Sequence, residues 1–565
     1  LTAQLVPLGQ ESPKTAKLTF STRDALFQAK VDPLSCTATF RIPKWDATKA
    51  ADYTVRHGDA AYSGTIRVEP VGRPLVVAGF TGNQDYLFPN NAVARNVAVQ
   101  NPDVLFFSGD QIYESVGGYG IVRAPTDSAD EATIRRATLN YLRKWYLLGW
   151  AFGDLMRDRP TLCLPDDHDV YQGNIWGEGG LNPSGMRNHA KGGFAEHPTF
   201  VNTVIRSQCS HHPDLPDPRP MKQGIDVFFG PMLYGRVSFA VLEDRYFKSG
   251  PQDKVNDWKG RPDHVKDPKY DVASLDKPGL VLLGERQEKF LEDWAGDWRG
   301  ADFKCVLSQT IFCNLANYHG GGRTFIFADL DSNGWPQTPR NNALRVLRKG
   351  YAFHYAGDQH LPSITQNGID AWGDAGYAFC VPSIAAGYPR SWLPDKEGRL
   401  VRNRPAQNLA NTGEYRDGFG NRVTVHGVGN PADKNRPGKE NTGHDKSSGH
   451  GVVRFDPAKL TITMECYRLQ IDPETPQPED QFPGWPKTIK LTDNRGQKVL
   501  RLLPEIVAPK GVARPVLRVS AVDSGELVYA VRLNQSRVKP WIYAEGKYKI
   551  ELGDPDADRW TVVNK

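Results

Sequence analysis

The sequence has no apolar run long enough to cross a membrane and no dense block of lysine and arginine. The first absence excludes a membrane-spanning helix, and the second leaves no evident nucleic-acid-binding groove. The formal net charge is only +5, which at most favours anionic substrates through the overall field of the protein. The chain begins at Leu1 and carries no signal-peptide pattern, so we expect that any export signal has already been removed.

Cysteine is also scarce, with 7 residues in a chain of 565. None of them forms a CxxC pair, which excludes a zinc knuckle of that kind. Cys163, Cys305 and Cys380 lie inside apolar runs, and we expect them to be buried free thiols. The cysteine count does not decide the redox compartment.

The chain is too long for one hydrophobic core, so more than one domain is expected. Residues 1–72 alternate polar and apolar side chains, which predicts a small N-terminal β-domain. Over residues 73–484 strands alternate with helices, which is typical of a layered α/β core. Residues 485–565 return to strand patterns and predict a C-terminal β-domain.

Two segments inside the predicted α/β core lack sustained periodicity. Residues 170–235 and 395–450 are rich in glycine, proline, histidine and asparagine. We expect both to be long loops that form walls of an active site. Further along, Thr338 and Pro339 predict a helix that is capped by the threonine and starts at the proline.

Three short apolar runs end in turns that carry carboxylates, imidazoles or both. In open α/β sheets, ligands bind at the carboxyl ends of the strands. Oxygen and imidazole donors are those that a divalent or trivalent metal requires. The three turns are therefore expected to converge on a two-metal hydrolytic centre. The runs with their turns are 104–107 with Asp110 and Tyr113, 161–165 with Asp166, Asp167, His168 and Asp169, and 351–356 with Asp358 and His360.

Five of these side chains are candidate metal ligands. Asp110 can bridge two cations about 3.5–4 Å apart, because a carboxylate has two oxygens. Asp358 and His360 would point to the same face of an extended segment, as two ligands or as a ligand and its partner. Tyr113 can offer a phenolate to a trivalent metal. Asp167 is assigned to a metal, although the division of roles within its cluster stays open.

Three further residues are candidates for catalysis. His168 is the candidate general acid or transition-state stabiliser. Arg245 ends a buried strand, where it can bind an anionic ester bidentately or form a structural ion pair. Asn174 lies just beyond the acidic cluster and can contact a metal or the substrate.

These motifs, in this order, resemble those of the PhoD-like (alkaline phosphatase D) metallophosphoesterases. The resemblance runs from about residue 75 to residue 469 and also includes 283–287 and 307–309. It implies a four-layer α/β/β/α core, phosphate-ester hydrolysis, an export history and an iron–calcium centre. It further implies that Asp110 and Tyr113 bind iron, and that Asp358 and His360 are metal ligands. The matching motifs are Gly109-Asp110-Gln111-Ile112-Tyr113, Asp166-Asp167-His168-Asp169-Val170 with Asn174, and Gly357-Asp358-Gln359-His360.

One departure from the family concerns the metal. The first core strand of the family commonly ends in a cysteine whose thiolate binds iron, whereas residues 79–83 contain no cysteine. Asn83 is the candidate substitute. Loss of a thiolate weakens the case for ferric iron and leaves zinc, manganese or magnesium as alternatives.

The sequence thus predicts a periplasmic or secreted metal-dependent hydrolase, a phosphatase or phosphodiesterase, that cleaves small-molecule or polymer-linked phosphate mono- or diesters. Two alternatives stay open. The same site can act on another oxyanion ester, such as a sulfate ester. A non-catalytic carbohydrate- or surface-binding protein with structural metals would fit the flanking β-domains and 13 tryptophans, but it fits the acidic strand ends poorly. The oligomeric state is not indicated.

Overall fold

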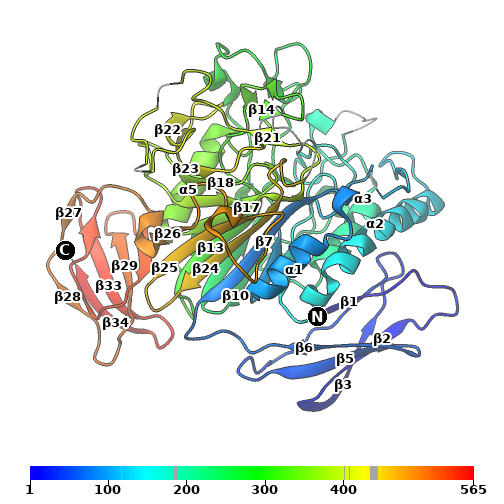
Figure 1. Ribbon diagram of the computed structural model, residues 1–565. Helices are drawn as coiled ribbons and strands as arrows, with labels where there is room; N and C mark the ends of the chain where they lie inside the picture. The colour runs from blue at the N-terminus through cyan, green and yellow to red at the C-terminus, as the bar shows by residue number, and fades with distance from the viewer. Residues whose placement is uncertain (116, 184–188, 400, 406, 433–442, 565) are drawn as a thin grey trace.

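The computed structural model describes residues 1–115, 117–183, 189–399, 401–405, 407–432 and 443–564 (Figure 1). Its core contains two large sheets. The first sheet has the strand order β26-β25-β24-β7-β8-β9, with β20 beside β7. Strands β7, β8 and β9 run parallel, so their carboxyl ends lie along one edge of the sheet. The strands of this sheet are β7 (Leu75–Asn83), β8 (Val104–Phe107), β9 (Thr161–Cys163), β20 (Ser383–Ala385), β24 (Gly449–Asp456), β25 (Thr461–Arg468) and β26 (Lys487–Lys490).

The second large sheet has the strand order β10-β11-β13-β17-β19-β18-β23-β22. Its central strands β11, β13, β17 and β19 are parallel, and the outer strands pair antiparallel. The strands are β10 (Gly230–Tyr234), β11 (Val237–Val241), β13 (Phe303–Thr310), β17 (Phe353–Gly357), β18 (Ser363–Asn367), β19 (Tyr377–Cys380), β22 (Gly413–Arg416) and β23 (Arg422–Val428).

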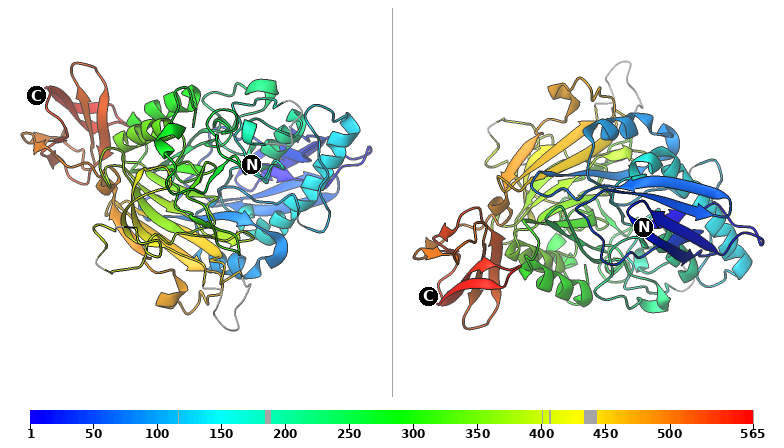
Figure 2. Two further views of the ribbon diagram at one scale, coloured as in Figure 1. Left: turned by 90° about the horizontal axis from the view of Figure 1, so that it is seen from above. Right: turned by 90° about the horizontal axis from the view of Figure 1, so that it is seen from below.

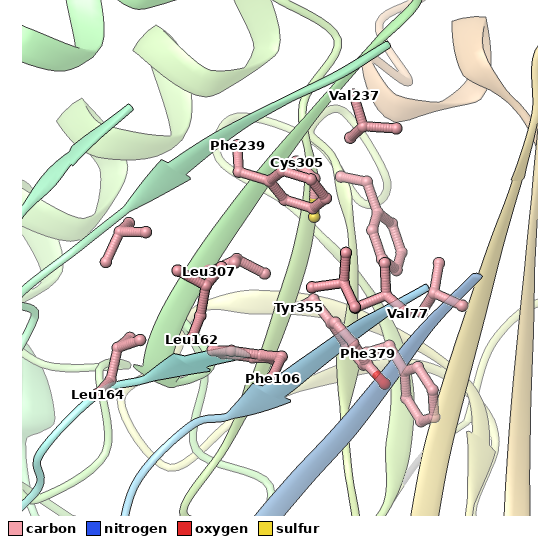
Figure 3. Packing of buried hydrophobic residues seen from close by; sticks show 14 of the residues in the cluster. Val77, Phe106, Leu162, Leu164, Val237, Phe239, Cys305, Leu307, Tyr355 and Phe379 are labelled. Atoms are coloured by element: carbon pink, nitrogen blue, oxygen red, sulfur yellow. The ribbon is translucent and has the colours of Figure 1, made fainter. Parts of the chain in front are cut away.

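The two sheets share one apolar core. Figure 3 shows Phe106 of the first sheet close to Leu307 and Tyr355 of the second. The rings of Phe106 and Tyr355 lie 5.5 Å apart, and both are buried. Burial of each such side chain contributes about 1.5–3 kcal/mol, so the packing fixes the relative position of the two sheets.

Helices pack against both sheets and complete a mixed α/β fold. Phe152 of α2 lies 5.6 Å from Phe80 of β7 and 5.5 Å from Phe107 of β8, measured between ring centroids. Leu291 of α4 and Leu344 of α5 share a cluster with apolar residues of β11 and β13. None of the helices in the described residues is both long and apolar enough to cross a membrane. The helices are α1 (Asn91–Gln100), α2 (Glu131–Arg157), α3 (Pro198–Cys209), α4 (Glu285–Gly296) and α5 (Gln337–Lys349).

Smaller sheets flank the core at both ends of the chain, on opposite sides of it (Figures 1 and 2). The N-terminal sheet has the order β3-β2-β5-β6, and the C-terminal sheet has the order β30-β29-β33-β34. Their strands are β2 (Thr15–Phe20), β3 (Arg23–Lys30), β5 (Ala51–His57), β6 (Ala60–Ile66), β29 (Val516–Ala521), β30 (Leu527–Arg532), β33 (Tyr548–Asp554) and β34 (Arg559–Asn564). Three strand pairs also occur near these ends: β1 (Thr2–Gln4) with β4 (Thr37–Thr39), β27 (Arg501–Leu502) with β32 (Trp541–Ile542), and β28 (Ile506–Val507) with β31 (Arg537–Val538). A further pair lies within the core segment and joins β12 (His264–Val265) to β16 (Ala328–Asp329).

The structure corrects the expectation of structureless segments. Residues 170–235 contain α3 and β10, and residues 395–450 contain β22 and β23. Helix α3 forms because Pro198 occupies its first turn, the His197 side chain accepts a hydrogen bond from the Thr199 N–H, and its apolar face is buried. Residues 184–188 and 433–442 of these segments lie outside the described residues.

Two smaller predictions can also be checked. All seven cysteines are buried and free, which confirms the prediction for Cys163, Cys305 and Cys380. Helix α5 begins at Gln337, so the predicted start at Pro339 was wrong. The capping carboxylate comes from Asp276, which accepts hydrogen bonds from the Thr338 N–H at 3.0 Å and hydroxyl at 2.6 Å. That partner is distant in sequence, so local pattern alone could not reveal it.

Candidate metal centre

The three predicted turns converge at the carboxyl ends of parallel strands from both sheets. Asp110 follows β8, Asp166 and Asp167 follow β9, and Asp358 follows β17. The first and third turns are tied together through β7, where the Asp358 N–H donates to the Thr81 hydroxyl at 3.0 Å. The Asn83 N–H donates to the Asp110 carbonyl at 2.9 Å. Hydrogen bonds to β7 therefore fix the first and third turns relative to each other.

Gly357 permits this close approach of the two sheets. A Cβ added at Gly357 would lie 2.2 Å from the Ser108 Oγ and 2.5 Å from the Thr81 Cβ. Neither neighbour can withdraw easily, because both are buried. Glycine is thus required at this position to bring the Asp110 turn and the Asp358 turn together.

Three predicted ligands have left-handed backbone conformations. The φ angles are 56° at Asp110, 61° at Asp358 and 49° at His360. Such angles are uncommon for residues other than glycine and cost about 1–3 kcal/mol each. Strain of this kind clusters at functional sites, where the side-chain direction matters more than local stability.

Asp110, Asp167 and His168 each place one potential ligand atom within 4.8 Å of the other two. The Oδ1 atoms of Asp110 and Asp167 and the Oδ2 atom of Asp166 are buried, and within the described part of the chain they accept no hydrogen bond. Buried carboxylate oxygens without a partner carry a large desolvation cost. A bound cation would satisfy all three, so this donor set fits metal.

Burial and mutual repulsion perturb these carboxylates. Burial raises the pKa of Asp110 to about 6 and that of Asp167 to about 7, and the negative charges of the neighbouring aspartates add to both shifts. Carboxylates packed this closely are stabilised in their charged form only by a nearby cation or by hydrogen bonds. The electrostatics of the site therefore also favour bound metal.

Asp169 has a different place from its neighbours in the acidic cluster. Its Oδ2 accepts the N–H groups of Asp110 and Asp166, both at 2.9 Å, and its Oδ1 accepts the Gln208 side-chain amide at 3.0 Å. Asp169 thus ties the first turn to the second. Its hydrogen-bonding capacity is largely used, which distinguishes it from Asp166 and Asp167.

His168 is held in place by Glu114 and Tyr113. Nδ1 lies 2.6 Å from Glu114 Oε2, and the ring packs 4.3 Å from the Tyr113 ring. Burial opposes the charge on His168, but Asp167, Asp110 and Glu114 raise its pKa to about 10. The side chain remains 26% exposed, so solvent or a substrate can reach it.

Tyr113 and His360 also meet at the centre. The Tyr113 hydroxyl lies 3.1 Å from His360 Nε2, while His360 Nδ1 lies 2.9 Å from the Tyr388 carbonyl. That carbonyl requires the proton to sit on Nδ1, which leaves the Nε2 lone pair directed at the centre. Burial lowers the pKa of His360 to about 4, which keeps the ring neutral, as metal ligation requires.

Arg245 is completely buried among three carboxylates. Its Nη2 lies 2.6 Å from Asp331 Oδ1, its Nη1 lies 3.2 Å from Asp358 Oδ2, and its Nε lies 3.4 Å from Asp166 Oδ1. Of the two roles considered for Arg245, these contacts match a structural ion pair. The guanidinium offsets part of the negative charge and holds the second and third turns in register.

Asn174 and Asn83 are both bonded to neighbouring protein groups. The Asn174 side-chain amide donates to Asp263 Oδ2 at 2.7 Å. The Asn83 amide donates to the Gln111 carbonyl at 3.3 Å, and its oxygen accepts from Asn90 at 3.1 Å. Asn83 lies beside the first turn, but its amide is held by these two contacts.

Sequence reasoning missed Glu114, Asp331 and Arg390. Glu114 sits one residue after Tyr113 and could have been found from that spacing. Asp331 lies in a turn after β16, and Arg390 begins the two-residue strand β21 (Arg390–Ser391). Neither belongs to a motif, so only the fold brings them to the site. The Nε and Nη1 atoms of Arg390 are buried and have no hydrogen-bond partner among the described residues. Its strongest favourable charge interactions are with Asp358, Asp329 and Asp331.

The fold is mixed α/β, and its buried, carboxylate-rich centre lies where strand ends converge. These two features together are those of a metal-binding α/β protein. The family model of the PhoD-like phosphatases matches residues 76–416, which is more than half of the chain. The chain therefore belongs to the PhoD-like phosphatase family, whose members are phosphoric ester hydrolases. No curated protein matches the chain.

Among the solved structures that resemble this chain, the structure of PhoD supports the fold. The structure of PhoD has a TM-score of 0.53 at 15% identity and covers 82% of this chain and 80% of that chain. A dimetal phosphatase from Danio rerio has a TM-score of 0.29 at 11% identity, with 56% of this chain and 92% of that chain covered. GAP50, the anchor in the inner membrane complex of Plasmodium, has a TM-score of 0.29 at 8% identity, with coverage of 70% and 85%. The last two are too distant to inform this chain further.

Proposed function

We propose that this chain hydrolyses phosphate mono- or diesters at the centre formed by the three turns. The observation that carries the proposal is the set of buried, unpartnered oxygens on Asp110, Asp166 and Asp167, which follow β8 and β9 of the first sheet. Membership of a phosphatase family supports a phosphate ester as substrate. The ester would be a small molecule or a group linked to a polymer.

The residues present fit two or more metal ions. Asp110, Tyr113, Asp167, Asp358 and His360 would hold them. Iron and calcium are proposed from the family resemblance, and zinc, manganese or magnesium are the alternatives. Carboxylate oxygens dominate the donor set, which favours hard cations. When bound, such metals lower the pKa of a coordinated water and polarise the phosphoryl oxygens.

His168 would act as the proton donor of the site. Glu114 at Nδ1 holds the imidazolium in place through a charge-assisted hydrogen bond. This leaves the Nε2–H free to protonate the leaving oxygen or to donate to a phosphoryl oxygen. Asn174 remains a candidate for substrate contact through its side-chain oxygen, since its amide N–H binds Asp263.

Arg390 would bind the ester's oxyanion, and Arg245 would act as a positioning residue. Arg245 hydrogen-bonds two carboxylates through Nη1 and Nη2 and lies 3.4 Å from a third, whereas Nε and Nη1 of Arg390 lack partners among the described residues. A buried guanidinium without a partner is costly, and a phosphate group offers the oxygens that it requires. The proximity of Arg390 to Asp358 supports a place next to the metals.

Other parts of the hypothesis concern organisation and location. We infer that the two packed sheets with their outer helices form the four-layer α/β/β/α core. We further infer an N-terminal β-domain over residues 1–72 and a C-terminal β-domain over residues 485–565. The flanking sheets support this division. A periplasmic or secreted location is proposed from the resemblance alone.

A panel of esters tests the proposed function. Wild-type protein and the Asp110→Asn, Arg390→Met and Arg390→Lys variants would be assayed on phosphomonoesters, phosphodiesters and sulfate esters. We expect phosphate-ester turnover in the wild type, its loss in Asp110→Asn, and a fall of about 10²-fold or more in kcat/KM for Arg390→Met. Arg390→Lys should recover part of that loss, because it keeps the charge.

Two outcomes would contradict the proposal. Turnover of sulfate esters alone would move the activity to a different oxyanion. Wild-type kinetics in Arg390→Met would show that this guanidinium does not bind the substrate.

A further inference from the structure

We propose that His264, His319 and Asp329 form a second metal site, for zinc or a similar first-row divalent cation, separate from the centre described above. One ligand atom from each lies within 4.8 Å of the others. His264 lies in β12, Asp329 in β16, and His319 in a third short strand, β14 (Tyr318–His319). Two imidazoles with one carboxylate are a donor set that binds zinc and related metals.

The distances in this cluster suit a shared ion better than direct hydrogen bonds. His264 Nε2 lies 4.0 Å from Asp329 Oδ1, and His319 Nδ1 lies 3.9 Å from Asp329 Oδ2. Both distances are too long for a hydrogen bond. Two ligands that are each about 2.0–2.2 Å from one tetrahedral zinc ion lie about 3.3–3.6 Å apart, so the side chains would close by a few tenths of an ångström on binding.

The orientation of His319 is that of a metal ligand. Its Nε2 lies 3.0 Å from the Ala316 carbonyl and must carry the proton, so Nδ1 presents a lone pair toward Asp329. Metal-bound histidines generally donate their other ring N–H to a carbonyl or carboxylate in this way. The residue is only 2% exposed.

His264 faces the same point from the paired strand. β12 and β16 are antiparallel, with His264 directly opposite Asp329. The His264 side chain is 10% exposed. Its Nε2 lies 3.6 Å from Asp263 Oδ2, which is too long for a hydrogen bond, and neither ring nitrogen makes another hydrogen bond within the described residues. A nearly buried imidazole without a partner is unfavourable, and a metal ion would satisfy it. Asp263 is itself held by Arg261 and Asn174.

The buried charge of Asp329 also calls for a cation. One backbone N–H, that of Asp331, donates to its Oδ1 at 3.1 Å. Arg390 offsets part of this charge through space. A divalent ion between the carboxylate and the two imidazoles would bind the carboxylate directly.

This second site would stabilise one wall of the proposed active site. Asp331, two residues after Asp329, binds Arg245 at 2.6 Å. The His319 ring packs 6.0 Å from the ring of Tyr388, whose carbonyl contacts His360 at 2.9 Å. An ion at this position would therefore hold together segments that orient Arg245 and His360, without taking part in the reaction.

Metal analysis of variants tests the proposal. Wild-type protein, His264→Gln, His319→Gln and Asp110→Asn would be stripped with chelator, loaded with zinc and freed of weakly bound metal. His426→Gln is the matched control, because His426 is a largely buried imidazole outside the cluster whose Nε2 also lacks a partner among the described residues. We expect His264→Gln and His319→Gln each to lose about one equivalent of zinc relative to the control.

Asp110→Asn separates the two sites. It should lose metal from the first centre and retain the zinc at His264, His319 and Asp329. Zinc content equal to that of the control in both histidine variants would overturn the proposal.

A measurement on the wild type does not depend on how the variants fold. Crystals soaked in zinc should show an anomalous difference peak between His264 Nε2, His319 Nδ1 and the Asp329 carboxylate. Absence of a peak there at saturating zinc would also overturn the proposal.

Discussion

Replacement of His168 by alanine tests how the proposed site manages protons. Nδ1 of His168 lies 2.6 Å from Glu114, and the ring lies against Tyr113 at the edge of the acidic cluster. Removal of the imidazole therefore takes away a proton donor while Asp110, Asp167 and Asp358 stay in place. Turnover should fall by about 10²–10⁴-fold if His168 is a general acid or a charge stabiliser.

The contact with Glu114 gives a second, smaller perturbation. A hydrogen bond to a charged group contributes about 1.5–3 kcal/mol. At about 1.4 kcal/mol per pKa unit, Glu114→Gln should lower the pKa of His168 by about 1–2 units. The sign follows from the charge, because loss of the carboxylate removes a stabiliser of the imidazolium. The decline of activity at high pH should therefore move to lower pH in Glu114→Gln.

The assay compares a nitrophenyl phosphate with an alkyl phosphate and measures bound metal in the same samples. Nitrophenolate leaves without much protonation, so His168→Ala should be less impaired on that ester if the imidazole is the acid. Equal losses on both esters would indicate stabilisation of the phosphoryl oxygens. Wild-type turnover on both esters would refute any catalytic role, and loss of metal would show that His168 is a ligand. His57→Ala, far away in the N-terminal sheet, is the control.

Three further changes test the packing and charge of the fold. Arg245→Met leaves three buried carboxylates without their cation, so the metal-free protein should lose about 3–5 kcal/mol of stability, measured by urea unfolding. An unchanged unfolding midpoint would be incompatible with the ion-pair role. Gly357→Ala places a Cβ 2.2 Å from the Ser108 Oγ, so it should lower the free energy of unfolding by about 1–3 kcal/mol and weaken metal binding. Normal metal affinity in this variant would argue against the close approach of the two sheets. Burial lowers the pKa of Lys304 to about 7, so the unfolded chain binds more protons above that pH and stability rises with pH. Relative to Lys304→Met, the free energy of unfolding of the wild type should rise by up to about 3 kcal/mol between about pH 7 and about pH 9.5. A difference in stability that does not depend on pH would exclude the lowered pKa of Lys304.

Most of the predicted site residues came from the pattern of strands followed by polar turns. Apolar runs followed by Asp110, Asp167 and Asp358 predicted convergence on the assumption that their strands are neighbours in one sheet. Strands β8 and β9 are neighbours in the first sheet, but β17 belongs to the second, so the packing of the two sheets brings in the third turn. The structure brings these residues together after β8, β9 and β17. The mixed α/β class was predictable for the same reason, since alternating strands and helices leave few other architectures.

What could not be predicted depends on contacts between distant segments. Asp331 lies in a turn and Arg390 in a two-residue strand, both too short for a periodic signal, and only the fold places them next to Arg245 and Asp358. The start of α5 was misplaced because Asp276 supplies the capping group. Helix α3 was missed because glycine- and proline-rich flanks hide its short apolar face.

The most direct test of the proposed function follows metal content and turnover together. Wild-type protein is dialysed against chelator and then reloaded with metal, and both quantities are measured at each stage. The unpartnered oxygens of Asp110, Asp166 and Asp167 are the atoms that the bound ions would satisfy. We predict that phosphate-ester turnover falls in step with the loss of metal and returns on reloading, whereas Asp110→Asn does not recover. Full turnover from wild-type protein that elemental analysis shows to be free of metal would contradict the proposed metal-dependent hydrolysis.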